Sequence, residues 1–240
     1  MGAIKARGFG ATSDGEHFSL YTLTNELGMS TGITDLGGCI VSLCVPDKDG
    51  RPVDIELGHD SAAGYAVNRP NLGAPIGRYA NRIGGASFVL DGKRYELEPN
   101  DHEVNNLREP KPLGLGLSSG DPAIKAAGGY DHNYALRPGV PTAADEGFVG
   151  ALRHVARVRG DKTGIVMDVA ADLPGMQLYT GNHVGGEQGK GGSVTVDHGA
   201  FCLETQFFPD AVNHPEFAQP VFGPEKPYRS RTIYSFSVEE

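Results

Sequence analysis

Four segments of this 240-residue chain place amide, guanidinium and carboxylate side chains where alternating strands would otherwise carry apolar groups. They are residues 73–83, 129–134, 174–182 and 202–211. The carboxylate of Glu204 lies close in sequence to Cys202, Leu203 and Phe207. Burying a carboxylate among such groups is costly unless it is hydrogen-bonded or functional. Chemistry alone leaves two interpretations open, a structural ion pair and a catalytic carboxylate.

Three weaker motifs are better explained as ordinary loops. Residues 116–120 spell G-x-S-x-G, but they lie in a Gly- and Pro-rich stretch rather than between a strand and a helix, as a hydrolase nucleophile requires. Residues 185–192 resemble a phosphate-binding loop, yet Val184 stands where the first glycine belongs and no Ser or Thr follows Lys190. The eight histidines lack the spacing of metal ligands, so the sequence predicts no metal site.

Apolar residues mostly alternate along the chain, which predicts strands rather than helices. Asp91 and Gly92 stand between two alternating runs and predict a two-residue hairpin turn. Other strands are predicted over residues 18–22, 40–45, 149–159, 163–170, 177–180, 192–196, 201–206 and 233–238. Residues 100–129 show little periodicity and predict a long irregular connection. The pattern favours an all-β sandwich or barrel formed as a single domain over residues 1–240.

Composition and charge argue against several functional classes. The chain has 21 Lys and Arg against 30 Asp and Glu, a net charge of −9, which disfavours nucleic-acid and membrane partners. It shows neither a secretory leader nor an apolar stretch long enough to span a bilayer, so we expect a cytoplasmic protein. Cys39, Cys44 and Cys202 are odd in number and lack C-x-x-C spacing. We therefore expect reduced, buried thiols.

The polar segments and their neighbours resemble the aldose 1-epimerase (galactose mutarotase) family. The resemblance is carried, in the family's order, by IGRYANRI (76–83), F-x-L-D-G-x-x-Y-x-L (88–97), GYDHNYAL (129–136), PGMQLYTGN (174–182), CLETQFFPDAVNHPEF (202–217) and YRSRTIYSFSV (228–238). It covers the chain from about residue 28 to the end. The resemblance implies an all-β supersandwich of antiparallel sheets, here shortened, and interconversion of the α and β anomers of hexoses such as galactose and glucose.

The resemblance also implies roles for five residues. Glu204, in the L-E-T-Q block, matches the family's general base, and Asn81, Arg82, Asp131 and Gln177 match its sugar ligands. Opening a pyranose ring needs a base for the C1 hydroxyl proton and an acid for the ring oxygen, but no cofactor. The implied partner is a small-molecule aldohexose, held by donors and acceptors in fixed geometry.

One part of the family's pattern is absent. Arg108 follows residues 105–107, where the family continues with a His-Gly-Gly run, so the resemblance implies an internal deletion junction near 107–108. The missing section, about a third of a typical member, includes the T-N-H block that holds the acid histidine. His102 and His132 are the nearest replacements in sequence. However, His102 is a lone histidine in a polar loop, and His132 should face away from a cleft that Asp131 enters.

Two alternatives to an active enzyme therefore remain open. One is a non-catalytic carbohydrate-binding β domain, and the other is an inactive shortened family member, whether a deletion product or an engineered compact form. A shortened sheet would also leave strand edges unpaired. We therefore expect self-association or lowered stability, with the strands that flank residues 100–129 the most disturbed.

Overall fold

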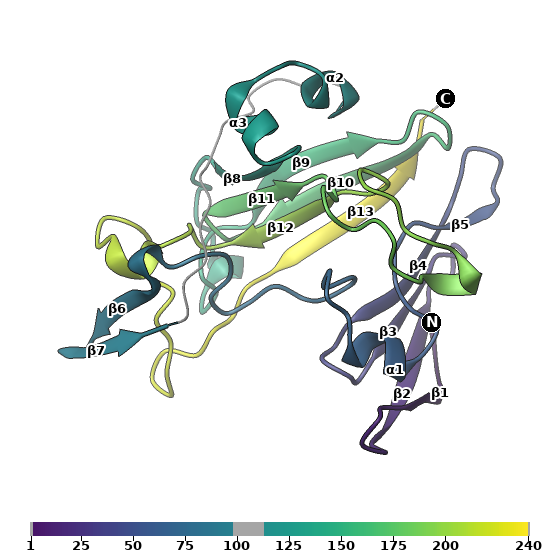
Figure 1. Cartoon of the computed structure of the whole chain (residues 1–240), viewed down its shortest axis with the longest axis horizontal. Helices are drawn as coiled ribbons and strands as arrows, with labels where there is room; N and C mark the ends of the chain where they lie inside the picture. The colour runs from purple at the N-terminus through teal and green to yellow at the C-terminus, as the bar shows by residue number, and fades with distance from the viewer. Residues whose placement is uncertain (1, 98–112, 240) are drawn as a thin grey trace.

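The computed structural model describes residues 2–97 and 113–239, and antiparallel β-sheets make up most of it (Figure 1). Thirteen strands in these residues form four sheets, and every ladder between named strands is antiparallel. The all-β prediction is confirmed. Among the described residues no helix is long and apolar enough to cross a membrane.

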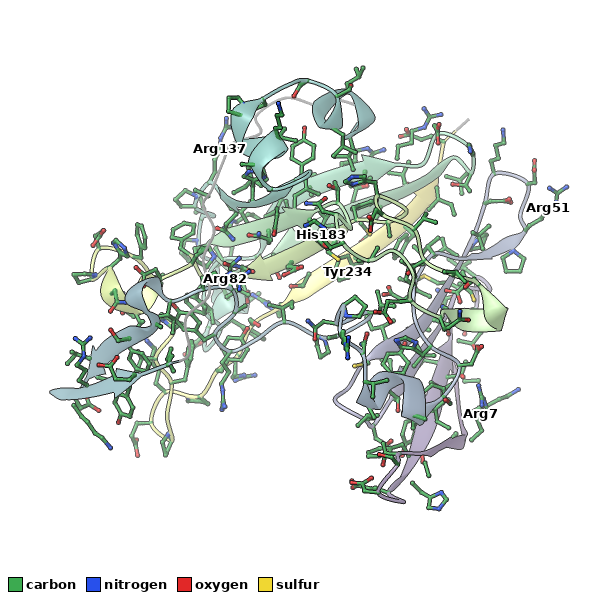
Figure 2. All side chains as sticks on the ribbon, in the orientation of Figure 1. Arg7, Arg51, Arg82, Arg137, His183 and Tyr234 are labelled. Carbon is green, nitrogen blue, oxygen red and sulfur yellow. The ribbon has the colours of Figure 1, made fainter. Side chains whose placement is uncertain are left out.

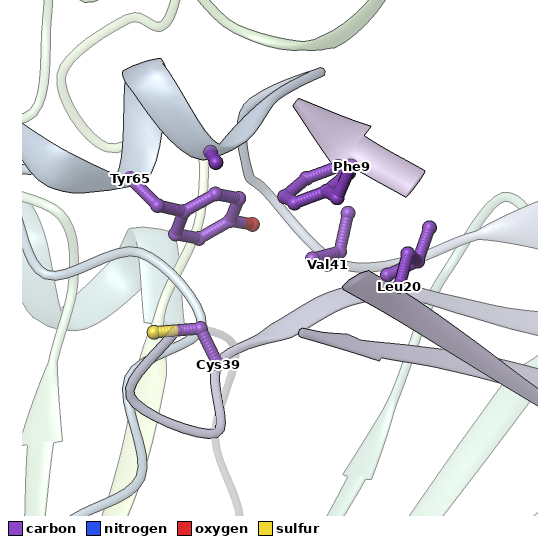
Figure 3. Packing of buried hydrophobic residues seen from close by; sticks show 6 residues of the cluster. Phe9, Leu20, Cys39, Val41 and Tyr65 are labelled. Atoms are coloured by element: carbon purple, nitrogen blue, oxygen red, sulfur yellow. The ribbon is translucent and has the colours of Figure 1, made fainter. Parts of the chain in front are cut away.

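The N-terminal sheet is a meander whose five strands pair in chain order. They are β1 (Ala3–Ala11), β2 (His17–Thr24), β3 (Ser30–Thr34), β4 (Ile40–Pro46) and β5 (Pro52–Asp54). The short helix α1 (Ala62–Ala66) covers this sheet, and Tyr65 packs with Phe9, Leu20 and Val41 in a buried cluster (Figure 3). Since full burial of such side chains contributes about 1.5–3 kcal/mol each, this cluster fixes α1 against the sheet.

Two three-stranded sheets form the second half of the fold. One has the order β13 (Thr232–Val238), β10 (Ile165–Ala171), β9 (Arg153–Arg159), and the other β12 (Cys202–Gln206), β11 (Gly175–Tyr179), β8 (Asp131–Ala135). Strands β12 and β13 run side by side (Figure 1), where the hydroxyl oxygens of Thr205 and Thr232 lie 2.6 Å apart. The two sheets therefore meet along these strands.

The sheet β8–β11–β12 has two chemically different faces. Tyr134 and Leu178 on one face pack with Tyr130 and Ile124 in a buried cluster. The helices α2 (Leu113–Leu117) and α3 (Pro122–Ala126) cover this face, and Asp121 caps α3 by accepting the backbone N–H of Ala123 at 2.9 Å (Figure 1). Because strand side chains alternate, the intervening residues point to the opposite face, which is left available for polar groups.

The predicted hairpin is present as β6 (Ser87–Leu90) and β7 (Lys93–Glu96). Asp91 and Gly92 have φ angles of 50° and 74°, the left-handed pair that a tight two-residue turn requires. The rings of Phe88 and Tyr95 stack across the ladder with centroids 5.1 Å apart. The remaining short elements are the 3₁₀ turns η1 (Gly84–Ala86), η2 (Ala143–Asp145), η3 (Lys190–Gly192) and η4 (Ala211–Asn213).

The structure corrects three expectations. The strand predicted over 192–196 is absent, because Gly191 and Gly192 adopt φ angles of 62° and 76° in η3 and leave only an isolated bridge nearby. The prediction of an irregular connection over 100–129 is wrong for residues 113–129, the part that the structure describes, because these residues contain α2 and α3. All three cysteines are free, but only Cys39 is buried; Cys44 is partly buried and Cys202 is exposed, since it lies on a hollowed face of its sheet.

Gly73 offers a test of how tightly the chain after α1 is held against β4. Its φ is 67°, and a Cβ there would lie 2.0 Å from the carbonyl oxygen of Ile40. Gly92 is the matched control, since its φ is 74° and a Cβ would meet nothing within 4 Å. We expect Gly92→Ala to cost about 1 kcal/mol of unfolding free energy, from backbone strain alone, which corresponds to roughly 2–4 °C in Tm.

Gly73→Ala should lower Tm by at least twice as much as Gly92→Ala in parallel thermal melts, because the clash with Ile40 adds to the same strain. Equal shifts in the two variants would show that the backbone at residue 73 moves aside freely.

Candidate active site

A cleft of about 1410 Å³ lies between the N-terminal sheet and the two three-stranded sheets. One wall comes from β4, the residues after β5 and residues 69–82, and the other from β8, β10, β11, β12 and β13. The backbone N–H of Lys48, in the β4–β5 turn, donates to the carbonyl of Thr163 in the β9–β10 turn at 3.0 Å. This hydrogen bond ties the two walls together beyond the ends of the strands.

Strand register places six polar or titratable side chains on the cleft face of β8–β11–β12. Tyr179 is paired with Asp131 on one side and Cys202 on the other, and Gln177 is paired with Asn133 and Glu204. Directly opposed residues in antiparallel strands share a face, and residues two apart do so as well. All six line the cleft.

Gln177 connects three segments of the chain through its side-chain amide. The residue is only 6% exposed. Its Nε2 donates to Oδ1 of Asp131 at 2.7 Å, and its Oε1 accepts a hydrogen bond from Nδ2 of Asn81 at 3.0 Å. Asn81 has a φ of 65°, which asparagine tolerates better than most residues, and its Oδ1 accepts the backbone N–H of Arg82 at 2.9 Å. The loop before β6 is therefore attached to the sheet floor.

A second attachment runs through Asp210, in the loop after β12. Its backbone N–H donates to the carbonyl of Arg82 at 2.7 Å, and its Oδ1 accepts the N–H of Gly84 at 2.7 Å. The same oxygen accepts Nδ2 of Asn213, while Oδ2 lies 3.1 Å from Nε2 of His214. These contacts fix the backbone around Arg82, which lines the cleft together with Tyr234 (both are labelled in Figure 2).

Glu204 is the titratable group at the centre of this face. It is half-buried, and its carboxyl makes neither a hydrogen bond nor an ion pair within the described residues. Burial, with a further contribution from the charge of Asp131, raises the pKa of Glu204 from 4.5 to about 7. A carboxylate with this pKa is a stronger base than an exposed glutamate, and it is still substantially ionised at neutral pH.

The structure brings together all five residues to which the sequence assigns a site role. Asn81, Arg82, Asp131, Gln177 and Glu204 line one cleft, although up to 123 positions separate them in the chain. Sequence reasoning missed five other residues that line it, namely Glu56, Asn133, Tyr179, His183 and Tyr234. The period-two pattern could have identified Asn133 and Tyr179, each two residues from a predicted ligand. No sequence pattern marks Glu56, His183 or Tyr234, which enter from other segments.

His132 lies on the opposite face of its strand from Asp131. It is 1% exposed, and its Nδ1 accepts the backbone N–H of Asp131 at 2.9 Å. Burial lowers the pKa of His132, which keeps the ring neutral. It cannot exchange a proton with a ligand in the cleft. The other histidine considered from sequence, His102, lies outside the described residues. In the described part of the chain no cluster of three or more His, Cys, Asp or Glu side chains could hold a metal ion.

Comparison with known proteins identifies the family. The family model described as aldose 1-epimerase matches this chain in two segments, residues 19–109 and 103–235. The chain belongs to the aldose 1-epimerase family. Together the two segments span most of the chain, and they meet where the sequence departs from the family's pattern.

Relatives of this epimerase-family chain include enzymes from animals and bacteria. Human galactose mutarotase is 26% identical over 344 residues, covering 94% of this chain and 96% of the relative. Aldose 1-epimerase from Escherichia coli strain K12 is 24% identical over 345 residues, covering 94% of this chain and 97% of the relative. Since this chain has only 240 residues, a large part of each relative has no counterpart in it.

Solved structures show the same fold. A GalM/aldose epimerase homologue from C. elegans superimposes with a TM-score of 0.72 at 16% identity. Galactose 1-epimerase from Lactobacillus acidophilus does so with a TM-score of 0.63 at 14% identity. Both comparisons cover the whole of each chain.

The raised pKa of Glu204 predicts a pH-dependent cost to stability. The pKa of Glu204 is about 7 in the folded state rather than 4.5. Below about pH 4.5 the carboxyl is neutral in both the folded and the unfolded chain, so it imposes no cost. The free energy of unfolding then falls as pH rises from about 4.5 through 7, because the unfolded chain releases this proton more readily. Glu204→Gln removes the buried charge, so at about pH 8 we expect the variant to be more stable by up to about 3 kcal/mol, and near pH 5 by much less.

Urea unfolding at the two pH values measures this difference. Glu225→Gln is the matched control, since Glu225 is exposed and lies outside the cleft. The same stability change for Glu204→Gln at both pH values would show that its carboxyl titrates normally.

Proposed function

We propose that this chain interconverts the α and β anomers of aldohexoses such as galactose and glucose, with Glu204 as the general base. The supporting observation is the position of Glu204, a carboxyl of raised pKa that is paired with Gln177 and feels the charge of Asp131, in a cleft with ample room for a hexose. Family membership supports the same reaction class. Family membership alone specifies neither the preferred sugar nor the catalytic residues.

The proposed reaction needs no external reactant. Ionised Glu204 removes the proton of the C1 hydroxyl, the C1–O5 bond breaks as C1=O forms, and O5 takes a proton from an acid. Rotation about C1–C2 then presents the other face of the aldehyde, and the ring closes by the reverse transfers. At the end of the cycle Glu204 is again ionised and the acid is again protonated.

The hydroxyl groups of the sugar are assigned to four residues. Arg82 and Asn81 offer hydrogen-bond donors from the loop before β6. Asp131 on β8 offers an acceptor, and the amide of Gln177 on β11 can both donate and accept hydrogen bonds. Because Gln177 is already bonded to Asp131 and Asn81, these ligands are held in place before a sugar arrives. Such preorganisation lowers the entropic cost of binding.

We also propose that a central section is missing from this chain near residues 107–108. The two matched segments of the family model meet at residues 103–109, which supports that position. In the family the missing section supplies the acid histidine. If nothing replaced this histidine, the chain would be a carbohydrate-binding domain or an inactive family member, which are the alternatives that the following experiment separates.

Polarimetry of freshly dissolved α-galactose and α-glucose tests the proposed function. We expect the wild-type protein to speed mutarotation beyond buffer alone, and Glu204→Gln to lower the rate by about 10²–10⁴-fold because the base is lost. The wild-type rate should rise with pH through about 7, as Glu204 ionises. Glu225→Gln should leave it unchanged.

A full-length relative assayed alongside sets the scale. We expect this chain to be slower, since loss of a positioned acid removes about 10²–10⁴ in rate. A wild-type protein that binds the sugar without any rate above buffer would be a binding domain. Activity that survives in Glu204→Gln would assign the base to another residue.

We further infer that the chain self-associates through unpaired sheet edges. Each three-stranded sheet ends in a strand without a ladder partner on its outer side, β9 in one and β8 in the other, within the described residues. Such edges pair readily with another chain, and β13 adds the exposed apolar side chains of Ile233 and Val238. Light scattering coupled to size exclusion should show dimers or larger species at micromolar concentration; a monodisperse monomer would contradict this.

A further inference from the structure

The hairpin of β6 and β7 stands apart from the other sheets at one end of the molecule (Figure 1). On one side it is held by η4, where Nδ2 of Asn213 donates to the carbonyl of Ser87 at 2.9 Å. On the other side, β7 has no ladder partner within the described residues. A two-stranded sheet is only marginally stable in water. The outer edge of β7 is therefore where this small sheet can gain a strand.

The outward backbone groups of β7 belong to two residues of opposite charge. The N–H of Leu97 donates to the carbonyl of Ala86 at 2.6 Å, which directs the backbone of Leu97 toward β6. Successive residues of a strand direct their N–H and C=O groups to opposite sides. The backbone groups of Tyr95 therefore also face β6, whereas those of Arg94 and Glu96 face outward.

A second copy of β7 fits this edge in one antiparallel register. A two-fold axis perpendicular to the sheet must pass through the position of a residue, not between two residues, because directly opposed residues share a face. With the axis at Tyr95, Arg94 of each chain lies opposite Glu96 of the other. With the axis at Arg94 or at Glu96, two like charges would be opposed. Electrostatics therefore selects the register centred on Tyr95.

The same register completes the hydrogen bonding of the edge and extends an aromatic row. Each pair of Arg94 and Glu96 exchanges two N–H···O=C bonds, since the backbone groups of both face outward. Phe88 and Tyr95 stack within each hairpin with ring centroids 5.1 Å apart, so two copies place four rings in a row on one face. Tyr95 is 37% exposed and Leu97 45% exposed in the single chain, and pairing covers part of this apolar surface.

The other free strand edges in the described residues lack this complementarity. Paired symmetrically about its midpoint, β1 would oppose two copies of Arg7, and β9 would oppose Arg153 and Arg159. Like charges directly opposite one another are destabilising. Strand β8 offers only the carboxyl of Asp131, and β5 has only three residues. These edges can still associate asymmetrically, but among the five strands β7 alone matches its own copy in charge.

We propose that two copies of this chain dimerise by pairing their β7 edges antiparallel about Tyr95, which forms a four-stranded sheet in the order β6–β7–β7–β6. The inference rests on the self-association proposed above and gives it a surface and a partner. A two-fold contact occupies both edges, so association stops at the dimer. Because the paired segment is short, we expect weak association with a Kd in the micromolar range.

Charge reversal on β7 tests this pairing. Analytical ultracentrifugation in low-salt buffer measures the dimer Kd of wild type, Arg94→Glu, Glu96→Arg and the double variant. Arg51→Glu is the matched control, since Arg51 is exposed in the β4–β5 turn. Each single change opposes like charges at two symmetric positions, so we expect it to weaken the dimer at least about 10-fold. The double variant should recover the wild-type Kd within about threefold, and Arg51→Glu should leave it unchanged.

Mixing the variants separates a broken interface from a damaged hairpin. Arg94→Glu makes the edge acidic and Glu96→Arg makes it basic, so an equimolar mixture should form mixed dimers although neither variant associates alone. Wild type and the double variant should each dimerise but exchange subunits poorly, because their mixed dimer opposes like charges. The β7 pairing is overturned if the folded single variants do not associate with each other, or if wild type and the double variant exchange freely. The second comparison decides alone if a single variant fails to fold.

Failure of this proposal and failure of the broader proposals give different results. Wild-type protein that stays monomeric across the micromolar range rejects the β7 pairing and self-association together. Dimers that persist unchanged in Arg94→Glu and Glu96→Arg reject only the β7 pairing and assign the contact to another edge. Neither Arg94 nor Glu96 lines the cleft, so the result is independent of whether the chain interconverts anomers.

Discussion

The cleft depends on one buried amide that must satisfy its oxygen and its nitrogen at the same time. Gln177 does so by accepting from Asn81 and donating to Asp131. A reversed amide would oppose two donors on one side and two acceptors on the other, so the orientation is fixed by its neighbours. The loop before β6 and strand β8 are thereby held against β11. Without this amide, the loop before β6 would be attached only through Asp210, and the side chains of Asn81 and Asp131 would lose the hydrogen bonds that orient them.

The same burial that builds the sheet also sets the protonation of its titratable groups. Glu204 and Glu56 have raised pKa values, whereas His132 on the covered face has a lowered one. Removal of water disfavours the charged form in each case, so a buried carboxyl favours its protonated acid and a buried imidazole favours its neutral base. Two carboxyls therefore titrate near neutral pH, although the charge of Lys190 opposes the shift at Glu56, and the histidine next to Asp131 stays inert.

Local patterns predicted the parts of the fold that depend on neighbouring residues. Asp91–Gly92 specified its hairpin by backbone conformation, and the alternation around Glu204 indicated β12. The valines at 194 and 196 suggested a strand, but the glycines before them turn the chain away. Helix α3 was missed although Asp121 and Pro122 form a recognisable helix start. Glu56 could not be recognised, because its place in the cleft arises only when the N-terminal sheet packs across β12 and β13.

The alternating faces of β11 bear on how chains of this kind can change length during evolution. Loss of a long section between strands leaves the register of the retained strands unchanged, and alignments with relatives span about a hundred positions more than this chain contains. Loss of one residue within β11 would be far more damaging. It would turn Met176 or Leu178 toward the cleft and Gln177 toward the helices. Large deletions at the ends of strands are therefore more accessible to this architecture than single-residue deletions inside them.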